Sequence, residues 1–187
     1  MAAKTSRLSQ FASLEFILGA FLTTVICFAV LFSDVLFPGA DKIDLMARLT
    51  KPFVSAAHPL GTDPLGRDVL ARVVAGGKIS LLVGFTSVIG AVVFGVVMGL
   101  IAGYYRGFWD MVVMRFADLQ LAMPFILLAI TFIAIVGGSL MNTIILLIIS
   151  QWVQYARLVR GSVLTLRERE FILSARAIGV KDWRIIL

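Results

Sequence analysis

The residues of this chain whose types and spacing could do chemistry lie mainly near its end. After Arg167-Glu168-Arg169-Glu170, an apolar stretch leads to Gly179, and a second amphipathic stretch begins near Asp182. Glycine readily takes the left-handed conformation that ends a helix, so we predict one short helix before Gly179 and another from Asp182. A partner could approach closely over the small residues of this segment and accept its large apolar ones in a groove. These residues are Ser174, Ala175 and Ala177, and Phe171, Ile178 and Trp183.

Elsewhere the chain offers little chemistry. The nearest approach to a phosphate-binding loop, Gly76-Gly77-Lys78-Ile79, lacks the Ser or Thr that should follow the lysine. We interpret the two glycines as a hinge, and any ATPase would be a separate subunit. The single histidine, His58, has no cysteine or carboxylate cluster beside it, and the single cysteine, Cys27, fits a packing role. We therefore predict no catalytic residue, no metal site and no cofactor.

The apolar composition of the chain indicates which elements hold these residues in place. Of 187 residues 60% are hydrophobic and 15% are charged, whereas a soluble domain is nearer half and a quarter. Every charged residue falls outside four windows of at least 18 residues, which are 16–33, 79–102, 119–136 and 139–156. Each window can cross about 30 Å of hydrocarbon as a helix. We predict an all-α integral membrane protein, a multi-pass bundle with four transmembrane helices.

The basic residues predict how the chain is oriented. Residues 157–187 carry seven Lys and Arg against three acidic residues, which predicts a cytoplasmic location. Four crossings then place the N-terminus in the cytoplasm too. The predicted segments are a cytoplasmic tail 1–15, a first transmembrane helix 16–37, an external loop 38–78, a core 79–156 with three transmembrane helices, and a cytoplasmic segment 157–187. The net charge of +6 thus records topology and a lipid environment, not a nucleic-acid partner.

Two segments, the first apolar window and the part of the external loop from Arg67, each allow an alternative interpretation. A signal peptide could explain the first window, but its 18 apolar residues exceed the usual length and no small-residue cleavage site follows, which favours a retained anchor. In the external loop, the pattern from Arg67 predicts a short amphipathic helix along the membrane surface, with a solvated connector as the alternative.

Along the second window, small residues recur in steps of four. Such a stripe lets another helix approach the backbone closely and predicts an intimate bundle. Pro124 removes a backbone donor and predicts a kink. No charged residue lies inside a window, which disfavours an autonomous ion-coupled carrier or channel. The stripe consists of Ser87, Ala91, Gly95, Gly99 and Gly103.

The segment around Gly179 resembles the cytoplasmic coupling loop of ABC importer permeases, whose pattern is Glu-Ala-Ala, three residues and Gly. Ala175 and Gly179 fall on the second alanine and the glycine, whereas Ser174 replaces the first alanine and Leu173 stands in place of Glu. The wider chain is similar to the dipeptide/oligopeptide/nickel subfamily. The motifs that carry this similarity are GTDPLGRDVL from Gly61, SLLVG from Ser80, GLIAGYY from Gly99 and DLQLAMP from Asp118.

The resemblance implies a permease subunit of the bacterial plasma (inner) membrane that imports peptides, nickel or related small solutes. Its implied partners are a second permease, two cytoplasmic ATPases and an external solute-binding protein. Family members have six crossings, so four would mean a C-terminally truncated chain with an incomplete coupling loop. The alternative is a membrane scaffold or assembly protein whose loop merely holds a partner. The implied ATPase-coupling residues are Glu170, Phe171, Ser174, Ala175, Arg176, Ala177, Gly179, Asp182 and Trp183.

Overall fold

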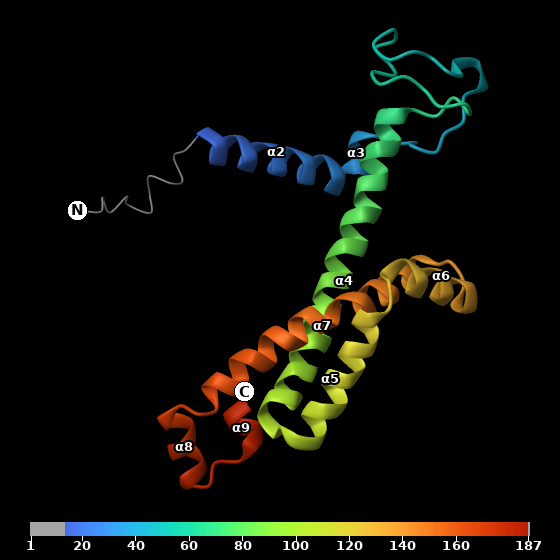
Figure 1. Ribbon diagram of the computed structural model, residues 1–187. Helices are drawn as coiled ribbons and strands as arrows, with labels where there is room; N and C mark the ends of the chain where they lie inside the picture. Colours follow the sequence, from blue (N-terminus) through green and yellow to red (C-terminus); the bar gives the residue numbers. More distant parts are fainter. Residues whose placement is uncertain (1–13, 187) are drawn as a thin grey trace. The chain divides into compact units, whose positions relative to one another are not determined.

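The computed structural model describes residues 14–186, and the regular secondary structure of this part is helical throughout. The chain divides into two compact units, with the boundary between Leu82 and Val83. This boundary falls inside the longest helix, α4, which spans Val69–Tyr105 (Figure 1). The two units are therefore described separately.

The first unit holds α2 (Leu14–Leu31), α3 (Ser33–Leu36), the 3-10 helix η1 (Leu45–Ala47) and the beginning of α4. Helix α2 corresponds closely to the first predicted window, and only Val30 of its residues is buried. An apolar helix with nearly all of its side chains exposed is suited to lipid contact. Near its end the chain is held to α4 by an ion pair between Asp34 and Lys78.

The loop between α3 and α4 folds around Asp63. Its carboxylate accepts hydrogen bonds from the backbone amides of Leu65 (2.8 Å) and Arg67 (3.0 Å) and from the side chains of Arg67 and Arg72, each at 2.8 Å. Partial burial raises the pKa of Asp63, but the hydrogen bonds from Arg67 and Leu65 and the charge of Arg67 outweigh it and lower the pKa to about 2. Gly66 has φ +76°, and a Cβ there would lie 1.6 Å from the Asp44 carbonyl oxygen, so the loop requires glycine.

The structure corrects two predictions in this region. The amphipathic helix expected within 38–78 is not a separate element, because residues 69–78 form the first turns of α4. No hinge occurs at Gly76-Gly77, where α4 continues unbroken. A Cβ on Gly77 would lie 2.8 Å from Cγ2 of Val30, so this glycine allows a close approach by α2 instead. With 37 residues, α4 is about 55 Å long, well beyond the ~30 Å of a hydrocarbon core.

The second unit contains the rest of α4, followed by α5 (Gly107–Ala122), α6 (Phe125–Val136), α7 (Leu140–Leu166), α8 (Glu170–Ala177) and α9 (Asp182–Ile186). Figure 1 shows α5 returning beside α4, with α7 crossing both. All three helices contribute to one buried core, which contains Ala102 from α4, Val113 and Ala117 from α5, and Trp152, Val153 and Ala156 from α7.

The predicted count of four crossings is not confirmed. Within residues 14–186, α2 and α4 are long and apolar enough to cross a membrane, and α5 with α6 would make a third span if the pair counts as one. The third predicted window is divided between these two helices, which bend by 96° where Pro124 interrupts them. Helix α7 has 27 residues, but Asn142, Gln151 and Gln154 dilute its apolar content. The all-α, multi-pass membrane class itself is confirmed.

Candidate functional site

The predicted stripe of small residues lies in the second unit, where three of its glycines face α7. A Cβ on Gly95 would lie 2.6 Å from the carbonyl oxygen of Trp152, and one on Gly99 would lie 2.6 Å from that of Ala156. A Cβ on Gly103 would lie 2.8 Å from a side-chain carbon of α7. Since such distances are too short for real contacts, only glycine lets the two backbones touch. The two remaining stripe residues, Ser87 and Ala91, are buried.

Two ion pairs hold α5 against α7. The guanidinium of Arg160 donates two hydrogen bonds to Asp110, at 2.5 and 2.6 Å, and Arg157 donates one of 2.6 Å to Asp118. A two-pronged arginine–carboxylate pair fixes orientation as well as distance. Helices α4, α5 and α7 therefore form one connected body.

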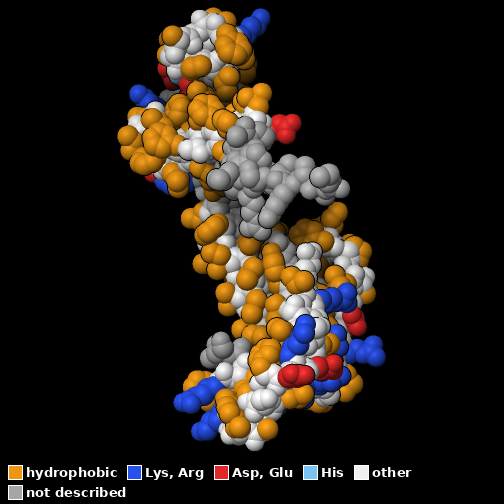
Figure 2. Space-filling view, turned by 90° about the vertical axis from the view of Figure 1, so that its left-hand side faces the viewer, with side chains coloured by type: hydrophobic (Ala, Val, Ile, Leu, Met, Phe, Trp, Pro, Cys, Tyr) orange, Lys and Arg blue, Asp and Glu red, His pale blue; other side chains and the backbone are white. Residues whose placement is uncertain are grey.

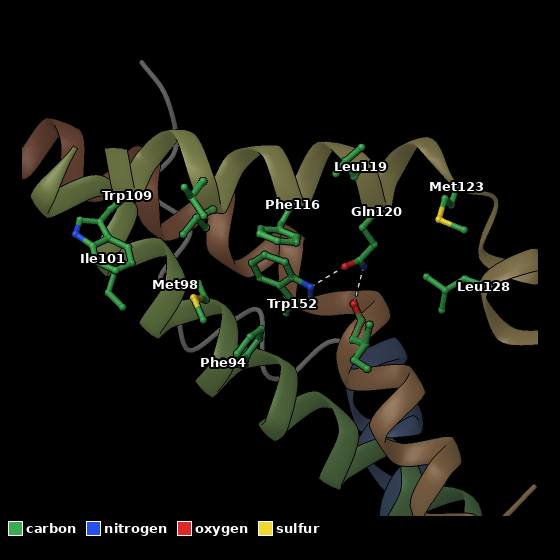
Figure 3. Close-up of a pocket in the computed structure, with 13 residues that line it drawn as sticks. Phe94, Met98, Ile101, Trp109, Phe116, Leu119, Gln120, Met123, Leu128 and Trp152 are labelled. Atoms are coloured by element: carbon green, nitrogen blue, oxygen red, sulfur yellow. Dashed lines mark hydrogen bonds between the residues drawn. The ribbon is translucent and has the colours of Figure 1, made fainter. Parts of the chain in front are cut away.

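A pocket of about 640 Å³ opens between these three helices (Figure 3). Its lining is almost wholly apolar, with Gln120 as the polar exception. The Gln120 side chain accepts a hydrogen bond of 2.7 Å from the indole N–H of Trp152 and donates to the carbonyl oxygens of Ile149 (2.5 Å) and Ser150 (3.2 Å). These bonds join the end of α5 to the middle of α7, and they satisfy a polar side chain that would be costly in an apolar setting.

Tyr104 connects the end of α4 to the C-terminal segment. It is only 5% exposed, and its hydroxyl donates a hydrogen bond of 2.5 Å to Oδ1 of Asp182 in α9. Its carbonyl oxygen accepts a bond of 2.6 Å from Arg167, and the guanidinium carbon of Arg176, in α8, lies 4.8 Å from its ring centroid. A single residue, through its side chain and its carbonyl group, thus contacts three parts of the segment that follows α7.

The turn between α8 and α9 has the geometry expected from the sequence. Gly179 has φ +79°, which confirms the predicted left-handed conformation, and α9 begins at Asp182. The amide of Val180 donates to the carbonyl oxygen of Ala175 (3.1 Å) and that of Gly179 donates to Arg176 (3.0 Å). This pair of bonds is the Schellman arrangement that ends many helices.

The other predicted coupling residues surround this turn. Glu170 occupies the first position of α8, Ala175 and Arg176 are half-buried, and Ser174 and Ala177 are exposed. Three large apolar side chains face solvent without cover from described residues, and they are Phe171 (62% exposed), Ile178 (81%) and Trp183 (56%). Figure 2 shows charged side chains gathered at this end of the second unit, whereas hydrophobic ones predominate elsewhere on its visible face. The segment therefore presents an apolar contact surface inside a charged region.

Comparison with known proteins assigns the chain to a family. Residues 95–187 match the family described as the binding-protein-dependent transport system inner membrane component. The chain belongs to this permease family. The matched region starts at Gly95 of the α4–α7 contact and includes every helix from α5 to α9.

Curated relatives support the same assignment. This permease is 47% identical over 132 residues to the dipeptide transport system permease protein DppC of Alkalihalophilus pseudofirmus, covering 71% of this chain and 43% of that protein. It is 44% identical over 132 residues to the glutathione transport system permease protein GsiD of Pectobacterium atrosepticum, and 47% identical over 133 residues to GsiD of Escherichia coli. Each GsiD match covers 71% of this chain and 44% of the relative. Each match thus covers less than half of the length of the relative.

Sequence reasoning missed two parts of the permease site. It gave Tyr104 no role, although the residue lies in the GLIAGYY motif, because its partner Asp182 is 78 positions away and no local pattern joins them. It also missed the pairing of Asp110 with Arg160, 50 positions apart. The only available signal was the presence of opposite charges just outside the apolar windows.

Proposed function

We propose that this chain is the permease subunit of an ATP-driven, binding-protein-dependent importer of peptides or peptide-like solutes. The names of two relatives, a dipeptide and a glutathione transport permease, support peptides among the predicted substrates. In this proposal the partners are a second permease, two cytoplasmic ATPases and an external solute-binding protein. The chain itself would make and break no covalent bond.

The observation that carries the proposal is the contact of Tyr104 with Asp182 and Arg176. In the proposal, an ATPase docks on the exposed apolar side chains of α8 and α9. A movement of α9 would then pass through Tyr104 to α4. Because α4 touches α7 at its glycines and α7 is paired to α5, the three helices would turn together between outward and inward access.

The proposed orientation places both termini in the cytoplasm. It requires that the bent α5–α6 pair and α7 each complete a crossing. Cysteine labelling tests this in a Cys27→Ala background. A membrane-impermeant maleimide should label Ser55→Cys in intact cells and Glu170→Cys only after permeabilisation. The two sites are scored separately against an external and a cytoplasmic marker. Labelling of both positions from the same side, or labelling of Glu170→Cys but not of Ser55→Cys in intact cells, would contradict the arrangement.

The function is tested with the full-length permease and its partners in proteoliposomes. The proposal predicts ATP-dependent uptake of a labelled di- or tripeptide that needs the solute-binding protein. The scaffold hypothesis predicts that the ATPases assemble on the permease without any uptake. An assembled complex that hydrolyses ATP but accumulates no peptide would contradict the proposed function.

A further inference from the structure

A polar pocket lies between the end of α4 and the C-terminal segment. It measures about 330 Å³ and is lined by Tyr104, Tyr105, Arg167, Arg176 and Asp182. The lining thus includes two arginine residues and one aspartate, and the aspartate carboxylate already accepts the hydroxyl hydrogen of Tyr104. The excess of positive charge suits an anion.

Arg176 lines this pocket and carries a donor without a partner. Among residues 14–186, its buried Nε has no hydrogen-bond partner. Its guanidinium is held in place over the ring of Tyr104, with 4.8 Å between the guanidinium carbon and the ring centroid. Buried donors normally have a partner, and arginine is the side chain best shaped to bind the oxygens of a phosphate.

The pocket also lies at the depth where lipid phosphates occur. The uncharged run 79–102 ends two residues before Tyr104, and 24 residues of helix span about 36 Å, slightly more than the hydrocarbon core. Tyrosine and arginine side chains that follow such a run mark the membrane–water interface. Basic pockets between helices at this level bind anionic head groups.

We propose that this pocket binds the phosphate group of an anionic membrane lipid, with Arg176 as the main donor and Arg167 beside it. The bound phosphate would rest against the residues that join α4 to α8 and α9. It would therefore stabilise that junction. This inference needs only the membrane location of the chain, and it stands apart from the proposed transport activity.

Native mass spectrometry of the full-length permease, released from phosphatidylglycerol or phosphatidylcholine micelles, tests the proposal. Wild-type protein should retain phosphatidylglycerol in preference to phosphatidylcholine. Arg176→Gln should lower that retention about tenfold, the loss expected for one charge-assisted hydrogen bond. Arg184→Gln is the matched control, because it removes the same charge from the same segment. Arg184 does not line the pocket and stacks on Trp183 instead. Equal retention by the two variants would overturn the proposal.

Two further arms separate binding from folding and identify the source of the phosphate. Asp182→Asn removes the single carboxylate of the pocket while keeping an acceptor for Tyr104, so it should raise phosphatidylglycerol retention, a gain that a folding defect would not produce. Competition by millimolar inorganic phosphate would support a site for phosphate itself, and its failure to compete would support the intact lipid. Unchanged or lower retention by Asp182→Asn would count against an anion site.

Discussion

The hydroxyl of Tyr104, in the last turn of α4, donates a hydrogen bond of 2.5 Å to Asp182, the first residue of α9. The two residues are 78 positions apart in the sequence. This bond joins a membrane helix to the segment that we propose as the ATPase seat. A displacement of α9 would have to carry this contact with α4 along or break it.

Tyr104→Phe removes this hydroxyl and keeps the ring under Arg176. A hydrogen bond to a partly exposed carboxylate contributes about 1 kcal/mol, so we expect amide exchange in residues 180–186 to accelerate roughly fivefold. Hydrogen-exchange mass spectrometry of the full-length permease measures this. Tyr105→Phe is the control, since Tyr105 is 52% exposed and its exchange pattern should match wild type. Identical exchange in all three proteins would show that the bond does not hold α9.

Gly95→Ala should destabilise the permease by about 1–3 kcal/mol, because the added Cβ would overlap the backbone of α7. The matched control is Gly84→Ala in the same helix, where nothing lies within 4 Å of the added carbon. Thermal unfolding in detergent should give a lower midpoint for Gly95→Ala alone. If both variants unfold at the wild-type midpoint, the close contact between α4 and α7 is not a determinant of stability.

Gln120→Leu should cost about 0.6–1.7 kcal/mol, the range found for hydrogen bonds between membrane helices. It leaves the Trp152 indole and two carbonyl groups of α7 without their partner. Gln154→Leu makes the same change at an exposed position of α7 and should be nearly neutral. Urea- or heat-induced unfolding followed by tryptophan fluorescence distinguishes the two variants. Loss of stability in Gln154→Leu but not in Gln120→Leu would contradict the role given to Gln120.

The predictable parts of the fold are those with a local physical signal. Charge-free windows located α2, most of α4 and the first part of α7, because a hydrocarbon core excludes charge over a fixed length. The turn at Gly179 was predictable because only glycine takes its backbone conformation cheaply. The stripe that includes Gly95 could be seen from its spacing of four residues.

The remaining features depend on contacts between distant residues. Proline predicts a kink but not its size, so the 96° bend at Pro124 could not be foreseen. Gly77 resembled a hinge, yet it permits contact with Val30, a residue that no local pattern places beside it. The partners of Tyr104 were hidden for the same reason.

In the proposed importer, the turn at Gly179 holds α8 and α9 in the position in which an ATPase would dock on them. A side chain at Gly179 would meet nothing within 4 Å, so only the backbone conformation, with φ +79°, opposes substitution. Asparagine tolerates that conformation and β-branched residues do not.

Solute-stimulated ATP hydrolysis by the reconstituted full-length complex is therefore the decisive measurement. Gly179→Val should insert normally but fall to the unstimulated rate, while Gly179→Asn keeps most of the stimulation. Wild-type stimulation in Gly179→Val would show that this turn does not couple the ATPase to the permease.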